Sequence, residues 1–230
     1  MIAERIPGPA EPPVLDLRLR GLSLGGTPVL GEIALTLHRC ETLALVGPSG
    51  VGKSTLLRIV AGLETGFDGT CGIDGCVAIV FQEPALLPWR SLRDNITIAT
   101  GVTPDVAQAV LDEVGLGERA ASFPNRLSLG QQRRVALARA FAVPPDVLLL
   151  DEPFVSLDPA LADEMMALFG RLRDRHRTAT ILVTHVMAEA EQLADRIVTL
   201  GGSPARITSE IQKSGAYFHS SASGVTAAGS

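Results

Sequence analysis

The sequence predicts an α/β fold: a mainly parallel sheet, an N-terminal antiparallel β portion and an inserted helical lobe. Short continuous apolar runs, typical of strands that are buried on both faces, recur along the chain. Hydrophobic residues make up 46% of the 230 residues and aromatic residues only 4%, so we expect an aliphatic core. Residues 84–143 differ from the rest because they contain helix-like segments and no convincing buried strand.

The elements follow from the spacing of apolar residues. Residues 14–20 and 33–37 alternate apolar and polar side chains, as half-buried strands do, and form the expected antiparallel portion. Continuous apolar runs predict buried strands at residues 43–46, 77–81, 147–150, 180–183 and 197–200. Helical spacing predicts helices at residues 53–61, 106–114 and 129–141.

We expect one domain, residues 14–210, between two tails. The prolines of residues 1–13 predict a flexible tail, and the small and polar residues of 211–230 predict a disordered one. Residues 1–13 lack the apolar segment of a signal peptide, and no run reaches the roughly 18 apolar residues that span a bilayer. At a membrane, a partner would have to span the bilayer. The net charge of −5 argues against broad nucleic-acid binding, so no nucleic-acid partner is expected.

Residues 47–54 match the phosphate-loop pattern G-x-x-x-x-G-K-[ST] in full. An expected buried strand precedes the motif and an expected helix follows it. The glycines let backbone N–H groups turn inward, Lys53 reaches the β- and γ-phosphates, and the Ser54 hydroxyl takes a Mg²⁺ coordination site. The alternative is an ordinary glycine-rich turn before a helix. The expected nucleotide-binding residues are Gly47, Pro48, Ser49, Gly50, Val51, Gly52, Lys53, Ser54 and Thr55.

Two carboxylates, Asp151 and Glu152, follow the apolar run at residues 147–150. Carboxylates at the end of a buried strand are costly unless a cation compensates them, and the Mg²⁺ of a nucleotide would do so. We expect Asp151 to hold Mg²⁺, directly or through water, and Glu152 to polarise the attacking water. The alternative is a solvent-facing acidic turn before Pro153.

The segment 127–140, Leu-Ser-Leu-Gly-Gln-Gln-Arg-Arg-Val-Ala-Leu-Ala-Arg-Ala, resembles the LSGGQ signature of ATP-binding-cassette (ABC) proteins and the helix that follows it. Gln82 resembles the Q-loop glutamine, Asp158 the D-loop aspartate and His185 the switch histidine of that family. Alone, His185 at a strand end would be read as structural. Together, the motifs extend the resemblance over about residues 14–207 and identify an ABC nucleotide-binding domain with a P-loop NTPase core.

The resemblance implies an ABC-type ATPase. Two copies would bind head to tail with two ATP molecules between them, and Ser128, Gly130 and Gln131 of one copy would act on the ATP of the other. The implied catalytic residues are Glu152, His185 and Gln82, and the implied Mg²⁺ ligands are Ser54, Gln82 and Asp151. The alternatives are a cassette whose nucleotide binding drives assembly with little turnover, and an ABC ATPase outside transport.

Among the positions that depart from the family pattern, two concern turnover and nucleotide preference. Leu129 stands where the signature has its first glycine, and we expect slower hydrolysis. Leu24 stands in place of the aromatic residue that stacks on adenine, and we expect weaker discrimination between ATP and GTP.

Residues 81–96 and 202–207 resemble the importers of nitrate, sulfonate and taurine. This resemblance implies import of a small solute, such as one of these anions, by a homodimer with an integral membrane permease. An extracytoplasmic solute-binding protein would act indirectly, and the chain would lie peripherally on the cytoplasmic face of the cell membrane. Leu86, Leu87 and Trp89 would dock on the permease; the alternative is that Trp89 caps the core of the lobe.

Overall fold

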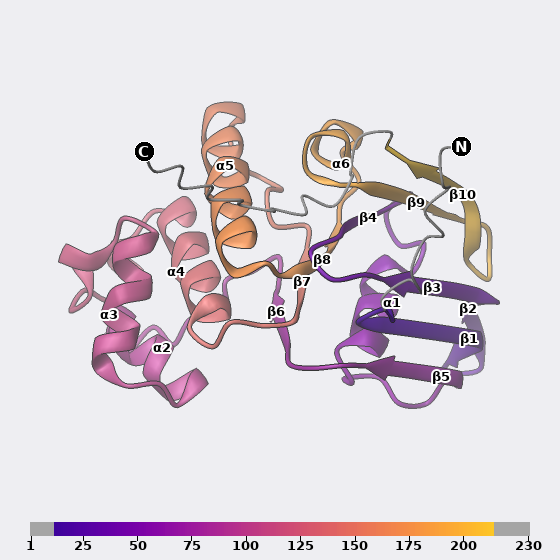
Figure 1. Cartoon of the computed structure of the whole chain (residues 1–230), viewed down its shortest axis with the longest axis horizontal. Helices are drawn as coiled ribbons and strands as arrows, with labels where there is room; N and C mark the ends of the chain where they lie inside the picture. The colour runs from indigo at the N-terminus through magenta and orange to yellow at the C-terminus, as the bar shows by residue number, and fades with distance from the viewer. Residues whose placement is uncertain (1–11, 214–230) are drawn as a thin grey trace, which may run out of the picture.

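The computed structural model describes residues 12–213, in which two β-sheets flank helix α1 and a helical lobe lies beyond the larger sheet (Figure 1). Strand β1 is the centre of the smaller sheet and pairs antiparallel with the other three strands, which confirms the predicted antiparallel portion. Leu15, Leu17 and Leu19 point into the core and alternate with polar residues, because only one face of this sheet is covered. The strands are β1 (Leu15–Leu24), β2 (Thr27–Leu30), β3 (Ile33–Leu37) and β5 (Asp68–Ile73).

The larger sheet has the strand order β10-β9-β4-β8-β7-β6. All neighbours are parallel except the antiparallel pair β9 and β10. The five predicted buried strands all lie in this sheet, and β10 is the one strand of it that the sequence did not predict. The strands are β4 (Thr42–Val46), β6 (Val77–Val80), β7 (Val147–Asp151), β8 (Ala179–Val183), β9 (Arg196–Gly201) and β10 (Arg206–Gln212).

Strand β10 corrects the start of the predicted C-terminal tail. Its ladder with β9 pairs Ile211 with Ile197 and Gln212 with Arg196, so the first two residues of the segment 211–230 form strand. Residues 1–11 and 214–230, which hold most of both predicted tails, lie outside the described residues.

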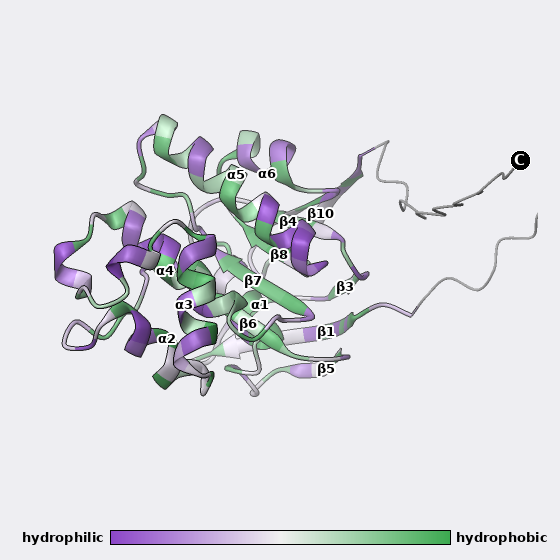
Figure 2. Cartoon of the chain, turned by 60° about the vertical axis from the view of Figure 1, so that its left-hand side comes forward, coloured by the Kyte–Doolittle hydropathy of each residue, from purple (hydrophilic) through white to green (hydrophobic). Residues whose placement is uncertain are grey.

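The central strands are apolar without interruption because both faces of the larger sheet are covered. In β7, Val147 and Leu149 pack with helix α1 (Lys53–Val60) and the smaller sheet. Leu148 and Leu150 pack on the other face, with helices α4 (Leu129–Phe141) and α5 (Pro159–His176). Figure 2 shows β7 as a hydrophobic strand in the middle of the molecule.

The helical lobe consists of α2 (Leu92–Thr100), α3 (Pro104–Glu113) and α4 (Leu129–Phe141), with two short 3₁₀ turns between α3 and α4. The predicted helices at residues 106–114 and 129–141 are confirmed as α3 and α4. Three helices were not predicted: α2, α5 (Pro159–His176) and α6 (Met187–Leu193). Within residues 12–213, no helix combines the length and the apolar character that crossing a membrane requires.

The parallel strands place the predicted site residues at one edge of the sheet. Val80 of β6 pairs with Leu150 of β7, Asp151 pairs with Val183 of β8, and Val183 pairs with Leu45 of β4. These four strands therefore end side by side, and the loops after them carry Gln82, Glu152, His185 and the phosphate loop. In α/β sheets this carboxyl edge is where ligands bind.

Candidate functional site

The loop between β4 and α1 has a backbone that only glycine can adopt at two positions. Gly47 has a φ of +152°, and a Cβ there would lie 2.5 Å from the carbonyl oxygen of Leu200. Gly52 has a φ of +112°, and a Cβ there would lie 2.7 Å from Cδ2 of Leu30. The two glycines therefore allow the loop to pack closely between the larger sheet and β2. They also allow its backbone N–H groups to turn inward.

The side chain of Lys53 curls back onto this loop. Its exposed fraction is 4%, and its Nζ donates hydrogen bonds to the carbonyl oxygens of Gly47 (2.8 Å) and Pro48 (2.9 Å). A buried ammonium group needs such partners. The ammonium group and the N-terminus of α1 together give the loop a positive character that suits an anion.

Ser54 and Asp151 meet across the end of the sheet, where the Ser54 hydroxyl donates a hydrogen bond of 3.0 Å to Oδ1 of Asp151. Burial raises the pKa of the Asp151 carboxyl, and the hydrogen bond from Ser54 partly offsets this effect. Hydroxyl and carboxylate oxygens are the donors that Mg²⁺ prefers, and the charge of a cation would relieve the burial of Asp151. The described residues contain no group of three or more His, Cys, Asp or Glu that could hold a metal, so Mg²⁺ here would need further ligands from phosphate or water.

Glu152 and His185 form the next pair along the edge, with 3.3 Å between Oε2 of Glu152 and Nδ1 of His185. Glu152 has a φ of +48°, a conformation that is unfavourable for a side chain with a Cβ, and its N–H donates to the carbonyl of Val183 (2.9 Å). This strained turn directs the carboxylate toward the end of β8 and so toward His185. Strain of this kind is typical of functional sites.

The sequence interpretation missed Glu189, which fixes the turn around His185. The hydroxyl of Thr184 donates to the Glu189 carboxylate and accepts a hydrogen bond of 3.0 Å from the N–H of Val186. Burial raises the pKa of Glu189, whose exposed fraction is 9%. An acidic residue on the helix directly after the strand was the available signal, but its contact with Thr184 depends on the tertiary fold.

Gln82 is exposed, and within residues 12–213 it makes no side-chain hydrogen bond. The structure brings it to the same sheet edge as Asp151 and Glu152, and no hydrogen bond joins its side chain to either carboxylate in the described residues. The following segment is fixed more firmly, because Arg139 of α4 donates to the carbonyls of Pro84 and Ala85.

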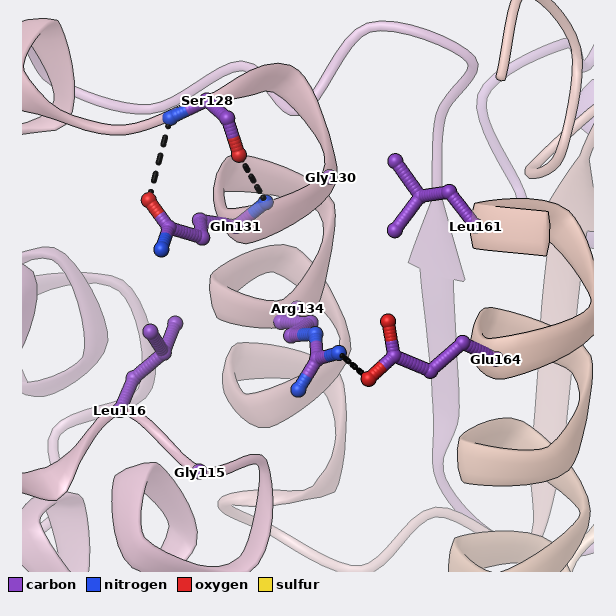
Figure 3. A pocket seen from close by; sticks show the side chains of 8 residues that line it. All are labelled: Gly115, Leu116, Ser128, Gly130, Gln131, Arg134, Leu161 and Glu164. Atoms are coloured by element: carbon purple, nitrogen blue, oxygen red, sulfur yellow. Dashed lines mark hydrogen bonds and ion pairs between the residues drawn. The ribbon is translucent and has the colours of Figure 1, made fainter. Parts of the chain in front are cut away.

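The signature residues cap helix α4 (Figure 3). Ser128 Oγ accepts from the N–H of Gln131 (3.3 Å), and Gln131 Oε1 accepts from the N–H of Ser128 (3.1 Å), which completes a capping box. A Cβ on Gly130 would lie 2.8 Å from Cδ2 of Leu161, so this glycine also allows α4 to pack against α5.

These three residues line a cavity of about 260 Å³ that Leu161, Arg134 and Glu164 also line. No residue of the phosphate loop lines this cavity. One copy of the chain therefore presents the signature and the phosphate loop at separate places.

Four further predicted residues are exposed, whereas Leu86 and Leu87 are half-buried. The carboxylate of Asp158 accepts a hydrogen bond from the N–H of Leu161 (3.0 Å) and so caps α5, a structural role that the sequence interpretation did not include. Trp89 has an exposed fraction of 68%, which contradicts the alternative that it caps the lobe's core. Leu24 and Leu129 are 43% and 41% exposed, so both side chains are free to meet a ligand.

The sequence and the fold are similar to those of known proteins. The sequence profile of the ABC transporter family matches residues 30–155. The chain is 45% identical over 213 residues to the aliphatic sulfonates import ATP-binding protein SsuB 2 of Burkholderia cenocepacia (strain HI2424), a match that covers 87% of this chain and 78% of that protein. It is 42% identical over 200 residues to the protein of the same name from Pseudomonas syringae pv. tomato (strain ATCC BAA-871 / DC3000), with 86% of each chain covered.

A solved structure is similar over nearly its full length. It is a dimeric, post-hydrolysis state of the ATP-binding cassette MJ0796 bound to ADP and Pi, with a TM-score of 0.74 and 26% sequence identity. The match covers 86% of this chain and 98% of that chain.

Proposed function

This chain belongs to the ABC transporter family as one of its ATPases, and from that premise we propose that it powers the import of a sulfonate-type anion through a separate permease. The observation that carries the proposal is the convergence of the phosphate loop, Asp151, Glu152 and His185 at one edge of the parallel sheet. The relatives described above are named for the import of aliphatic sulfonates, which supports this class of solute.

Nucleotide binding starts at the phosphate loop. The backbone N–H groups of residues 47–55, apart from Pro48, and the N-terminus of α1 receive the phosphates. Lys53 exchanges the carbonyls of Gly47 and Pro48 for the β- and γ-phosphate oxygens. Its Nζ already lies inside the loop, so this exchange needs no large movement.

Ser54, Asp151 and Gln82 are the residues that would hold Mg²⁺. When bound, Mg²⁺ neutralises charge that develops on the transferred phosphoryl group. The Ser54 hydroxyl supplies one oxygen, and Asp151 contributes directly or through water. Gln82 is exposed at the same sheet edge, where it can approach once nucleotide is present.

Glu152 and His185 act on the water that attacks the γ-phosphorus. Glu152 accepts a hydrogen bond from this water and polarises it, while His185 holds the γ-phosphate. The new bond joins the water oxygen to the γ-phosphorus, the bond to the bridging oxygen breaks, and ADP and phosphate result. The contact between the two side chains fixes both for this task.

A second copy completes each site. Ser128, Gly130 and Gln131 lie away from the phosphate loop of their own copy and would contact the ATP bound to the other. The dimeric state of the similar cassette structure supports this arrangement.

The exposed face around Trp89 would dock on a permease, and the ATPase would thereby lie on the cytoplasmic face of the membrane. Leu86 packs partly against the core of the lobe, whereas Trp89 stands free for a partner. An extracytoplasmic solute-binding protein would deliver the anion to the permease. Trp89→Ala should leave the ATPase of the isolated chain intact and abolish its stimulation by permease, binding protein and sulfonate.

The test measures Mg²⁺-dependent ATP hydrolysis and the oligomeric state of the wild type and of Glu152→Gln, each with ATP. We expect the wild type to turn over ATP, and the variant to be inactive but dimeric with ATP. If both dimerise and neither hydrolyses ATP, even with the permease present, the chain is an assembly module in which Leu129 has removed turnover. If neither binds ATP, the proposed function is wrong.

A further inference from the structure

Arg139 connects the signature helix to the loop that follows Gln82. It lies near the C-terminal end of α4, and its Nη2 and Nη1 donate hydrogen bonds of 3.0 Å each to the carbonyl oxygens of Pro84 and Ala85. These two carbonyls begin two residues after Gln82. Ala85 has a φ of +46°, which is unusual for a residue with a Cβ, so a specific backbone shape accompanies this contact.

The next part of the same loop is held by Asn95 of α2, which is fully buried. Its Oδ1 accepts from the N–H of Leu87 (2.6 Å). Its Nδ2 donates to the carbonyls of Leu87 (3.1 Å), Arg90 (3.1 Å) and Ser91 (2.9 Å). Residues 84–91 thus form an anchored segment that is tied to the lobe at two places, while Gln82 itself is free.

Helix α4 is therefore a rigid connection between two functional elements. Its N-terminal end carries Ser128, Gly130 and Gln131, and Arg139 lies ten residues after Leu129, or about 15 Å along a helix. Any movement of the signature end displaces the guanidinium of Arg139, and with it the backbone of residues 84 and 85.

Packing alone does not explain an arginine at this position. Among the described residues, Arg139 makes no ion pair and donates only to main-chain carbonyls. Desolvation lowers the pKa of the guanidinium, so placing the charge here has a cost that an aliphatic residue would avoid. The planar fork of arginine suits two successive carbonyls, which a single lysine nitrogen cannot span in the same way.

We propose that Arg139 is a positioning residue that couples the two ATP sites: contact of Ser128, Gly130 and Gln131 with the nucleotide of a second copy moves α4, and Arg139 repositions Gln82 at the nucleotide of its own copy. This inference rests on the two-copy arrangement of the proposed function. It identifies the physical connection by which one site detects the other.

Trp89 gives a direct test, because it is the only tryptophan of the chain and lies in the anchored segment. In the Glu152→Gln background, tryptophan emission is recorded with and without MgATP over a series of protein concentrations. Equilibrium dialysis measures MgATP binding, and light scattering measures the dimer. We expect the emission change to rise with the dimer fraction and to be lost in Arg139→Gln, although MgATP binding persists.

Arg134→Gln is the matched control. Arg134 lies on the same helix and donates to the carbonyl of Val114 (3.2 Å) and to Glu164, but it does not touch residues 84–91. We expect its emission change to equal that of the background. Equal loss in both variants would mean that general weakening of α4 is responsible, and would overturn the proposal.

Two further results would overturn the proposal. The first is an unchanged emission response in a folded Arg139→Gln variant. The second is a full emission response in monomers, because Gln82 of the same copy would then be sufficient to produce it. If Arg139→Gln does not fold, the same measurement is made on Arg139→Lys. We expect a reduced emission response in this variant, and a full response would contradict the proposal. Failure of the proposed function looks different, because then the background protein neither binds MgATP nor dimerises, and this inference falls with it.

Discussion

Nδ1 of His185 lies 3.3 Å from Oε2 of Glu152, although 32 positions of the sequence separate the two residues. The register that pairs Asp151 with Val183 brings them together, since Glu152 directly follows β7 and His185 lies two residues after the end of β8. The contact restrains the orientation of both side chains at this edge of the sheet. Removing either partner should therefore impair the chemical step more than nucleotide binding.

We predict that His185→Ala lowers kcat by about 10²-fold while KM for ATP changes little, because His185 positions Glu152 and the γ-phosphate for the chemical step, and misplacement by about 1 Å can cost about 10²-fold. Steady-state hydrolysis measures both constants. His38→Ala, which changes a half-buried histidine in the turn before β4, at the other end of that strand from the phosphate loop, is the control and should behave like the wild type. A kcat within twofold of wild type for His185→Ala would remove His185 from the mechanism.

We predict that Asp151→Asn stabilises the nucleotide-free chain while abolishing Mg²⁺-dependent hydrolysis. Burial raises the pKa of Asp151, so the folded state disfavours the ionised form that exists at neutral pH. The wild-type free energy of unfolding should accordingly rise as the pH falls from neutral through the raised pKa, toward the unfolded value of 3.8. The Asp151→Asn variant lacks this titration. Its free energy of unfolding at neutral pH should therefore be higher than that of the wild type by about 1 kcal/mol, or roughly 2–4 °C in Tm.

Thermal unfolding between pH 5 and about pH 8, where most proteins are folded, measures the difference in Tm between Asp151→Asn and the wild type. Asp146→Asn is the matched control with the opposite sign. A hydrogen bond from the N–H of Cys76, and then one from Arg39, lower the pKa of Asp146, so its replacement should destabilise the chain. Asp151→Asn would contradict the prediction if it lowered the Tm of the nucleotide-free chain.

The sequence was most informative where local pattern and tertiary environment agree. The strands with both faces covered were predicted because they contain continuous apolar runs, such as residues 147–150 of β7. Strands β2, β5 and β10 were missed because few of their residues are buried and their ladders with β1 and β9 define them. Helix α5 had readable signals that were overlooked: Asp158 as cap, a proline at its start, and apolar residues at helical spacing.

The site residues also fall into two groups: those that a local sequence motif reveals, and those that only the tertiary fold brings together. The phosphate loop and the pair Asp151 and Glu152 are contiguous motifs, so the sequence contains them whole. The contact of His185 with Glu152 depends on strand register, and that of Thr184 with Glu189 on the turn between β8 and α6. Neither can be read from residue types alone.

We predict that Leu129→Gly raises kcat by up to about tenfold, because small displacements of a positioning group can change rates by such factors. Leu129 is the first residue of α4 and its side chain is 41% exposed beside Gly130, where it would hold the signature backbone away from a facing nucleotide. Leu129→Ala removes most of the side chain without adding the backbone freedom of glycine, and should give an intermediate rate. A kcat that is unchanged or lower in both variants would show that Leu129 does not limit turnover.

We predict similar affinities for ATP and GTP in the wild type, because Leu24 offers an apolar contact without a ring that stacks on the base. Leu24→Tyr should tighten ATP binding by about 1 kcal/mol, or roughly fivefold, through base stacking. Equilibrium dialysis with both nucleotides measures this change. Leu63→Tyr, an exposed leucine beyond the far end of α1, is the control and should have no effect. A strong ATP preference in the wild type would contradict the prediction.

We predict that Arg196→Met destabilises the fold by about 3–5 kcal/mol, because it leaves a buried carboxylate without its partner. Nε of Arg196 lies 2.7 Å from Oε1 of Glu41, and both side chains are only 11% exposed. The guanidinium also donates to the carbonyl of Thr36 and to Glu210 at 2.8 Å, so it joins β3 of the smaller sheet to β9 and β10 of the larger one. Urea unfolding measures the change in free energy.

Arg18→Met is the control for this network, because Arg18 forms an exposed pair with Asp16 at 3.4 Å and its loss should cost less than about 1 kcal/mol. The double variant Arg196→Met with Glu41→Leu should recover part of the loss, since it removes the orphaned charge as well. If Arg196→Met cost no more than the control, the two sheets would be held together by the shared apolar core around α1 alone. Recovery in the double variant would instead show that the buried charge, rather than lost packing, accounts for the destabilisation.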